Sequence, residues 1–180
     1  SIHKHYANVA EALSTRDLRP VDLVDIGDVV IVPIADIHRG TLRALKYARR
    51  MAGDVRAVCI VTTPDQEERI RQRWARFPEV TIGIELVVIS YDFRDILTPL
   101  IEYIEHVNAE EYPGRLITVV IPEFVPNSIT ANLLHNQTAN ILRFRLYVHE
   151  NIVVINVPYH IQRNNAEAEN AEPETWVSLQ

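Results

Sequence analysis

The stretch DVVIVPIAD, residues 28–36, is a short and nearly continuous apolar run. Such a run is typical of a β-strand that is buried on both faces. Four further segments have a similar strand character, at residues 55–63, 81–90, 115–124 and 151–160. Between the strands lie four segments with helical signals, at residues 39–53, from Thr63 onward, at 94–111 and at about 128–149. Five strands that alternate with four helices predict parallel βαβ units with right-handed crossovers.

The clearest helix start in the chain is TPDQ, residues 63–66. Thr63 is a preferred N-cap residue, Pro64 suits the first helical position, and Gln66 completes a capping box. The preceding helix ends at Gly53, because glycine readily adopts the backbone conformation that follows a helix C-terminus. These signals place the loops where the alternation of strands and helices requires them.

The chain is therefore predicted to form an α/β fold with a doubly wound, five-stranded parallel sheet in the order 3-2-1-4-5. Ligands of such sheets bind beyond the carboxyl ends of the strands, where the winding reverses. This point lies between strands one and four. The expected walls of the crevice are PIADIHR (33–39) and PEFVPNS (122–128), with TTP (62–64) beside them.

Three regions are expected along the chain. Residues 1–27 combine an amphipathic helix, with apolar side chains at helical spacing, and a connector that follows it. Residues 28–161 form the α/β domain. Residues 162–180 are polar and acidic, and we expect them to be a mobile tail. The chain starts with SIHKHYANVAEAL and lacks an initiator methionine, which suggests a piece of a longer or processed polypeptide.

Composition narrows the class of protein. Hydrophobic residues make up 47% of the 180 residues and charged residues 23%, as in an ordinary globular domain. The net charge of −6 argues against nucleic acid as a partner. No segment has the roughly 20 apolar residues of a membrane span. The single cysteine, Cys59, is expected to be unpaired and buried, which fits a reducing compartment.

The sequence contains none of the common catalytic or cofactor motifs. It has no GxxxxGK[ST] or GxGxxG phosphate loop, no GxSxG nucleophile elbow and no Cys/His metal spacing. Only 5 glycines are present, and none lies between residues 115 and 180. We therefore expect a protein that is not an enzyme and that has no resident cofactor or metal.

The stretch LLHNQTANIL, residues 133–142, interrupts an apolar helix pattern with four consecutive polar residues, His135–Thr138. Four consecutive positions cover most of a turn, so at least one or two of these side chains face the same way as the apolar ones. One interpretation is a helix start, with Asn136 as its cap and free N–H groups that favour an anion. The other is a continuous helix whose polar turn is satisfied internally. Both interpretations stay open on the sequence.

Other polar residues adjoin the predicted crevice. His38 and Arg39 follow strand one and either contact a ligand or serve as a helix cap and plain surface. Glu123, near the tip of strand four, either accepts from a ribose or base or pairs with a neighbouring arginine. Tyr159 and His160 end strand five, an edge strand that could pair with another chain.

Four strings in the chain carry a family resemblance: VIVPIADIHRGTLRALKYAR, VVIPEFVP, LLHNQTANIL and VVINVPYHI. They resemble the cytosolic C-terminal domain of bacterial APC-superfamily permeases. These are described as amino-acid permeases, and some relatives are potassium uptake transporters controlled by cyclic di-AMP. The resemblance covers about residues 5–161 and implies a universal-stress-protein-like fold behind the last membrane helix. PEFVPNS stands where ATP-binding universal stress proteins have a Gly-rich string, so a different polar set would bind a ligand here.

The resemblance implies a regulatory domain on the cytoplasmic face of the membrane, in one polypeptide with the transmembrane part. It also implies a homodimer that binds cyclic di-AMP or another adenine nucleotide. The candidate ligand-binding residues are Asp36, His38, Arg39, Thr62, Glu123, His135, Asn136, Gln137, Thr138, Tyr159 and His160. The main alternative is a structural dimerisation scaffold without a small ligand, and a nucleotide-processing enzyme has no support in the motifs.

Overall fold

The computed structural model describes residues 8–19, 24–93, 95–125 and 137–160. Its centre is a five-stranded sheet in the order β3-β2-β1-β4-β5, and every neighbouring pair is parallel. The strands are β1 (Ile26–Pro33), β2 (Asp54–Val61), β3 (Glu85–Ser90), β4 (Leu116–Val125) and β5 (Ile152–His160). The predicted fold class and strand order are confirmed, and β5 is an edge strand as expected.

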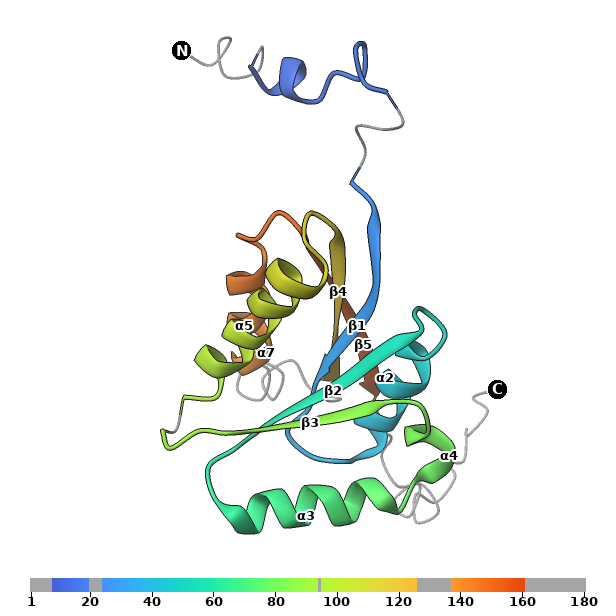
Figure 1. Cartoon of the computed structure of the whole chain (residues 1–180), viewed down its shortest axis with the longest axis vertical. Helices are drawn as coiled ribbons and strands as arrows, with labels where there is room; N and C mark the ends of the chain where they lie inside the picture. The colour runs from blue at the N-terminus through green and yellow to red at the C-terminus, as the bar shows by residue number, and fades with distance from the viewer. Residues whose placement is uncertain (1–7, 20–23, 94, 126–136, 161–180) are drawn as a thin grey trace, which may run out of the picture.

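Helices cover both faces of this sheet (Figure 1). The described elements are α2 (Arg39–Ala48), α3 (Pro64–Ala75), α4 (Pro78–Thr81), α5 (Leu97–His106), the π-helical turn η2 (Val107–Glu111) and α7 (Gln137–Leu146). Helices α2, α3 and α4 lie on one side, and α5 and α7 lie on the other. The result is a sheet between two helical layers, the arrangement that right-handed βαβ crossovers produce when the winding reverses.

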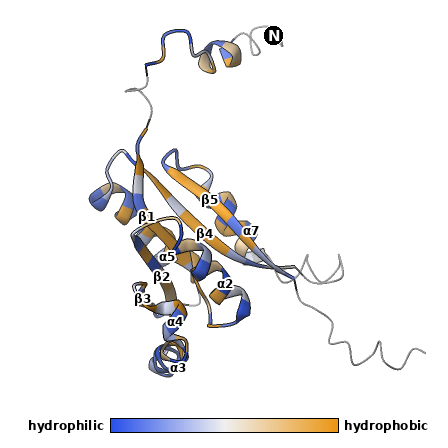
Figure 2. Ribbon diagram, turned by 90° about the vertical axis from the view of Figure 1, so that its right-hand side faces the viewer, coloured by the Kyte–Doolittle hydropathy of each residue, from blue (hydrophilic) through white to orange (hydrophobic). Residues whose placement is uncertain are grey.

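Strand β1 explains why the sheet needs two helical layers. Val30 and Val32 belong to the core beneath α2, whereas Val29 and Ile31 belong to the core beneath α5 and α7. All four side chains are at most 2% exposed. Side chains alternate between the faces of a strand, so a continuous apolar run can be buried only when both faces are covered. Figure 2 shows the same distribution, with strongly hydrophobic strands at the centre.

Three predicted elements have different bounds in the structure. The helix expected to end at Gly53 ends at Ala48 with Arg49 as its C-cap, and the Gly53 N–H instead donates to the Asp28 carboxylate at 2.8 Å. The third strand was expected over 81–90, but it begins at Glu85 because Pro78–Thr81 forms the short helix α4. Gly83 follows this helix with φ of 76°, a conformation that glycine adopts without strain. The helix expected over 94–111 is α-helical only at Leu97–His106 and continues as the π turn η2, in which the Tyr112 N–H donates to the Val107 carbonyl.

The N-terminal helix is described only in part, at residues 8–12. Val9 is 40% exposed and Leu13 is 75% exposed, so the described portion of its apolar stripe is not covered. The helix expected over residues 128–149 is described from Gln137. The acidic tail predicted at 162–180 lies outside the described residues, and the predicted boundaries of the three regions stay predictions. No helix in the described ranges is both long and apolar enough to span a bilayer.

Candidate functional site

An open cleft of about 540 Å³ lies at the carboxyl ends of the central strands. Its walls come from the loop after β1, from β2 and β4, from one face of α3, and from the first turns of α5 and α7. This is where the strand order reverses, so the predicted position of the crevice is confirmed. The volume falls within the usual range for small-molecule sites in proteins.

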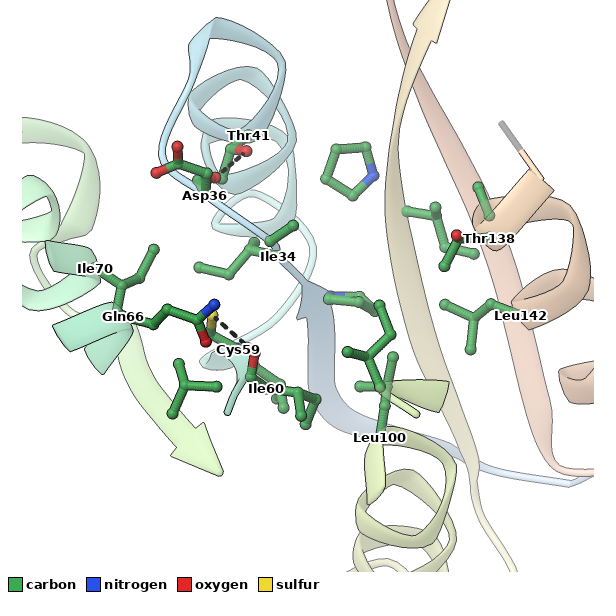
Figure 3. A pocket seen from close by; sticks show the side chains of 18 of the residues that line it. Ile34, Asp36, Thr41, Cys59, Ile60, Gln66, Ile70, Leu100, Thr138 and Leu142 are labelled. Carbon is green, nitrogen blue, oxygen red and sulfur yellow. Dashed lines mark hydrogen bonds between the residues drawn. The ribbon is translucent and has the colours of Figure 1, made fainter. Parts of the chain in front are cut away.

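The floor of the cleft is apolar and its rim is polar (Figure 3). Ile34, Ile70 and Leu100 line the interior together with Leu142 of α7. Polar side chains stand around them, contributed by the β1 loop, by α3 and by α7. Such a lining suits a ligand that has a flat apolar part and polar substituents.

The loop after β1 is held in place by the first turn of α2. The Thr41 hydroxyl donates to the Asp36 carbonyl at 2.7 Å, and the Ile37 N–H donates to the Asp36 carboxylate at 2.7 Å. His38 is the N-cap of α2, and its Nδ1 accepts from the Thr41 N–H at 3.0 Å. Asp36, His38 and Thr41 all line the cleft. The capping alternative for His38 is therefore confirmed, and its ring also faces the site.

Burial lowers the pKa of His38 below its usual value, against an opposing attraction from Asp36. A neutral imidazole keeps Nδ1 able to accept from the Thr41 N–H, which a doubly protonated ring cannot do. The cap at the cleft wall thus depends on an uncharged His38.

Two residues predicted for the site do not line the cleft. Arg39 is exposed at the start of α2, since a helix turns each residue by 100° from the one before and His38 already faces the cleft. Thr62 closes the capping interaction of α3 instead: its N–H and hydroxyl both donate to the Gln66 Oε1 atom, at 2.7 and 3.1 Å. The prediction that Arg39 and Thr62 contact a ligand stays a prediction.

Glu123, Tyr159 and His160 also lie outside the cleft lining. The Glu123 carboxylate is 3.6 Å from the guanidinium of Arg143 on α7, so the ion-pair alternative for Glu123 is confirmed. Tyr159 and His160 are the last residues of β5, where the register pairs them with Phe124 and Val125 of β4. They do not line this cleft, because β5 is one strand removed from the point of reversal, and their contact with a ligand stays a prediction.

The polar turn that the sequence singled out is described only at its end. His135 and Asn136 lie outside the described residues. Gln137 is the first described residue of α7, and Thr138 lines the cleft opposite α3 (Figure 3). The prediction that this turn adjoins the crevice is confirmed for Thr138. The choice between a helix start and a continuous helix stays open.

Helix α3 contributes three cleft residues that the sequence reasoning missed, Gln66, Arg69 and Arg73. They stand three or four positions apart on the face that also carries the buried Ile70. Ile70 was recognised as an inner-face residue, so the same spacing could have indicated its polar neighbours. Arg73 forms an ion pair with the Asp36 carboxylate, which joins α3 to the β1 loop across the rim.

Cys59 also adjoins the cleft but is almost fully buried. Burial raises the pKa of its thiol to about 11, so the thiolate is scarce at neutral pH. Within the described ranges, no group of three or more His, Cys, Asp or Glu side chains is placed to hold a metal ion.

The fold and the cleft define a doubly wound α/β domain with a candidate small-molecule site at the reversal of its sheet. The chain belongs to the family of the KimA potassium transporter C-terminal domain, whose family model matches residues 26–159. The match runs from the first residue of β1 to the penultimate residue of β5, so it covers the whole sheet.

A full-length relative supports the same assignment. The chain is 30% identical over 164 residues to the potassium transporter KimA of Bacillus subtilis (strain 168). The aligned part is 91% of this chain and 26% of the relative, so the chain spans about a quarter of that transporter. The predicted resemblance to the C-terminal domain of a transporter family is therefore confirmed. Of the two kinds of relative named for that family, the comparisons identify the potassium transporters.

Proposed function

We propose that this domain is the regulatory part of a potassium transporter and that it binds a nucleotide in the cleft. The transmembrane part would belong to the same polypeptide, and the domain would lie on the cytoplasmic face of the membrane. Family membership supports the connection to a transporter. The observation that carries the ligand proposal is the open cleft of about 540 Å³ at the sheet reversal.

The lining of the cleft favours a nucleotide over a fully apolar ligand. Ile34, Ile70 and Leu100 offer an apolar surface to a base, while Arg69 and Arg73 stand at the polar rim. Thr138 adds a hydroxyl from the opposite wall. Among nucleotides, cyclic di-AMP is the first to test, because the family resemblance of the sequence implies control by this second messenger.

Binding in the domain would control transport only if the ligand favours one conformation of the transporter over another. The cleft is built from both helical layers, since α3 lies on one side of the sheet and α5 and α7 on the other. A ligand that contacts all three helices would therefore restrain the layers relative to each other. This restraint is the change that the transmembrane part would sense.

Isothermal titration of the purified domain with cyclic di-AMP, ATP and AMP tests the proposal. Thr138→Trp places a bulky ring in the cleft and should abolish binding. Asn140→Trp is the matched control, because Asn140 is exposed on the same helix and does not line the cleft. Saturable binding that only Thr138→Trp removes supports the site, and equal loss in both variants would place the ligand elsewhere.

A structural dimerisation scaffold is the second candidate, and exposed apolar side chains near the end of α7 and just after it favour it. Phe144, Tyr147 and Val148 are each at least 68% exposed, which is unusual for neighbouring large apolar residues. The scaffold predicts a dimer in sedimentation equilibrium that Phe144→Glu separates into monomers. It also predicts no heat with any of the three nucleotides.

A further inference from the structure

The charged residues of the cleft have a composition unlike that of the whole chain. Among the described lining residues, the carboxylate and guanidinium side chains are those of Asp36, Arg69 and Arg73. Two positive charges face one negative charge there, whereas the chain has a net charge of −6. Both positive charges come from helix α3, so one wall of the cleft attracts anions within an acidic protein.

The arginines on the two faces of α3 differ in their ion pairs. On the outer face, Arg71 forms an ion pair with Glu67 one turn earlier, at 2.7 Å. On the cleft face, the Arg69 guanidinium makes no ion pair or hydrogen bond with any described residue. An arginine offers five N–H donors in a planar fork that matches phosphate, and those of Arg69 are available at the rim.

Arg73 is paired, but its pair is exchangeable. Its guanidinium contacts the Asp36 carboxylate, and the two side chains are 47% and 45% exposed. Ion pairs between such solvent-exposed groups contribute little to stability. A phosphate group can accept two parallel N–H···O bonds from an arginine, and charge-assisted pairs of this kind are among the strongest hydrogen bonds in proteins. An incoming phosphate can therefore replace the Asp36 carboxylate at Arg73.

We infer that helix α3 is the anion-binding wall of the cleft, with Arg69 as the direct contact of a phosphate and Arg73 as a second contact that Asp36 competes for. This inference rests on the proposed function and names the ligand class, a phosphate ester whose apolar part lies on the isoleucine and leucine floor. Asp36 is then an affinity-setting residue, because its carboxylate repels the phosphate and occupies Arg73.

Titration of four variants with cyclic di-AMP tests this assignment. Asp36→Asn keeps an oxygen for the Ile37 N–H but removes the competing charge, and it should tighten binding roughly threefold to fivefold. Arg69→Gln should weaken binding by about tenfold or more, and Arg73→Gln by less. Arg71→Gln, on the outer face of the same helix, should bind like the unchanged domain. Adenosine, which lacks phosphate, should be insensitive to all four changes.

Inorganic pyrophosphate is the second probe and separates the two levels of the argument. Nucleotide binding that is equal in Arg69→Gln and Arg71→Gln would overturn the anion wall and leave the proposed function standing. Pyrophosphate binding that depends on Arg69, without binding of any nucleotide, would keep the wall and overturn the nucleotide proposal. No binding of either probe, even to Asp36→Asn, would overturn both. Thermal unfolding of each variant confirms that it is folded.

Discussion

Replacement of Arg56 by methionine should destabilise the domain more than the loss of any exposed arginine. Arg56 lies in β2 with its side chain only 12% exposed. Its guanidinium donates to the Asp54 carboxylate at 2.6 Å, to both Glu111 oxygens at 2.9 and 2.5 Å, and to the Tyr103 hydroxyl at 3.3 Å. The network connects the start of β2 with α5 and with the π turn η2.

The size of the destabilisation depends on how well water solvates the Asp54 and Glu111 carboxylates once Arg56 is removed. Removal of one partner from a buried ion pair costs about 3–5 kcal/mol. The side chains of Asp54 and Glu111 are 30% and 40% exposed, so water partly rehydrates their carboxylates after the substitution. The cost therefore lies at or below the lower end of that range. We expect Arg56→Met to lower the free energy of unfolding by about 2–3 kcal/mol. At about 3–4 °C per kcal/mol for a domain of this size, Tm falls by about 6–12 °C.

Thermal and urea unfolding, followed by circular dichroism, measure the change. Arg71→Met is the matched control, because the pair of Arg71 with Glu67 is exposed and should cost less than about 0.5 kcal/mol. Arg56→Lys keeps the charge but not the planar fork, and it should fall between the two. A change in Arg56→Met no larger than that in Arg71→Met would refute the reasoning.

The stabilisation by the Arg56 network should depend on pH. The hydrogen bond from Arg56 lowers the pKa of Glu111 below its usual value. A carboxylate with a lowered pKa in the folded state stabilises the fold above its unfolded pKa, and this contribution is lost as the pH falls through the folded value. The difference in stability between the unchanged domain and Arg56→Met should therefore be full near neutral pH and shrink in acid.

Two further predictions concern the cleft walls. Burial lowers the pKa of His38, so its cap stabilises α2 above the unfolded histidine pKa, and this contribution is lost as the pH falls through the folded value. The His38→Asn variant keeps an acceptor for the Thr41 N–H. Its free energy of unfolding should therefore depend less on pH between 7 and 5 than that of the unchanged domain. A pKa of about 11 for Cys59 should slow its alkylation at pH 8 by about two orders of magnitude relative to an unfolded control, and labelling as fast as in urea would contradict this.

Much of the fold was predictable because its signals are local. The run at 28–36 shows that one strand is buried on both faces, and TPDQ at 63–66 marks a helix start; the structure confirms that Thr63 caps α3. The predicted bounds of elements were wrong where a feature that the apolar spacing does not show sets the end of the element. The helix α4 displaced the start of β3, and η2 changed the hydrogen-bond pattern at the end of α5 without changing the apolar spacing.

The position of the cleft was predictable from the sequence, but the residues that line it were predictable only in part. Asp36, His38 and Thr138 line the cleft as expected, because each directly follows or opposes the end of a central strand. Arg39 does not, although it adjoins His38 in the sequence. Arg69 and Arg73 do, although they follow the end of β2 by eight residues or more, because α3 packs with their face toward the cleft.

The sequence by itself determined the class of fold, the strand order and the place of the cleft. These depend on apolar periodicity and on the handedness of crossovers, which every short segment expresses. Only the tertiary structure decided which cations reach the cleft. A helix turns its side chains by 100° per residue, so the rotation of α2 and α3 against the sheet turns Arg39 outward and brings Arg69 and Arg73 to the rim. That rotation is set by the packing of both helices in the core, through residues such as Leu45 and Ile70.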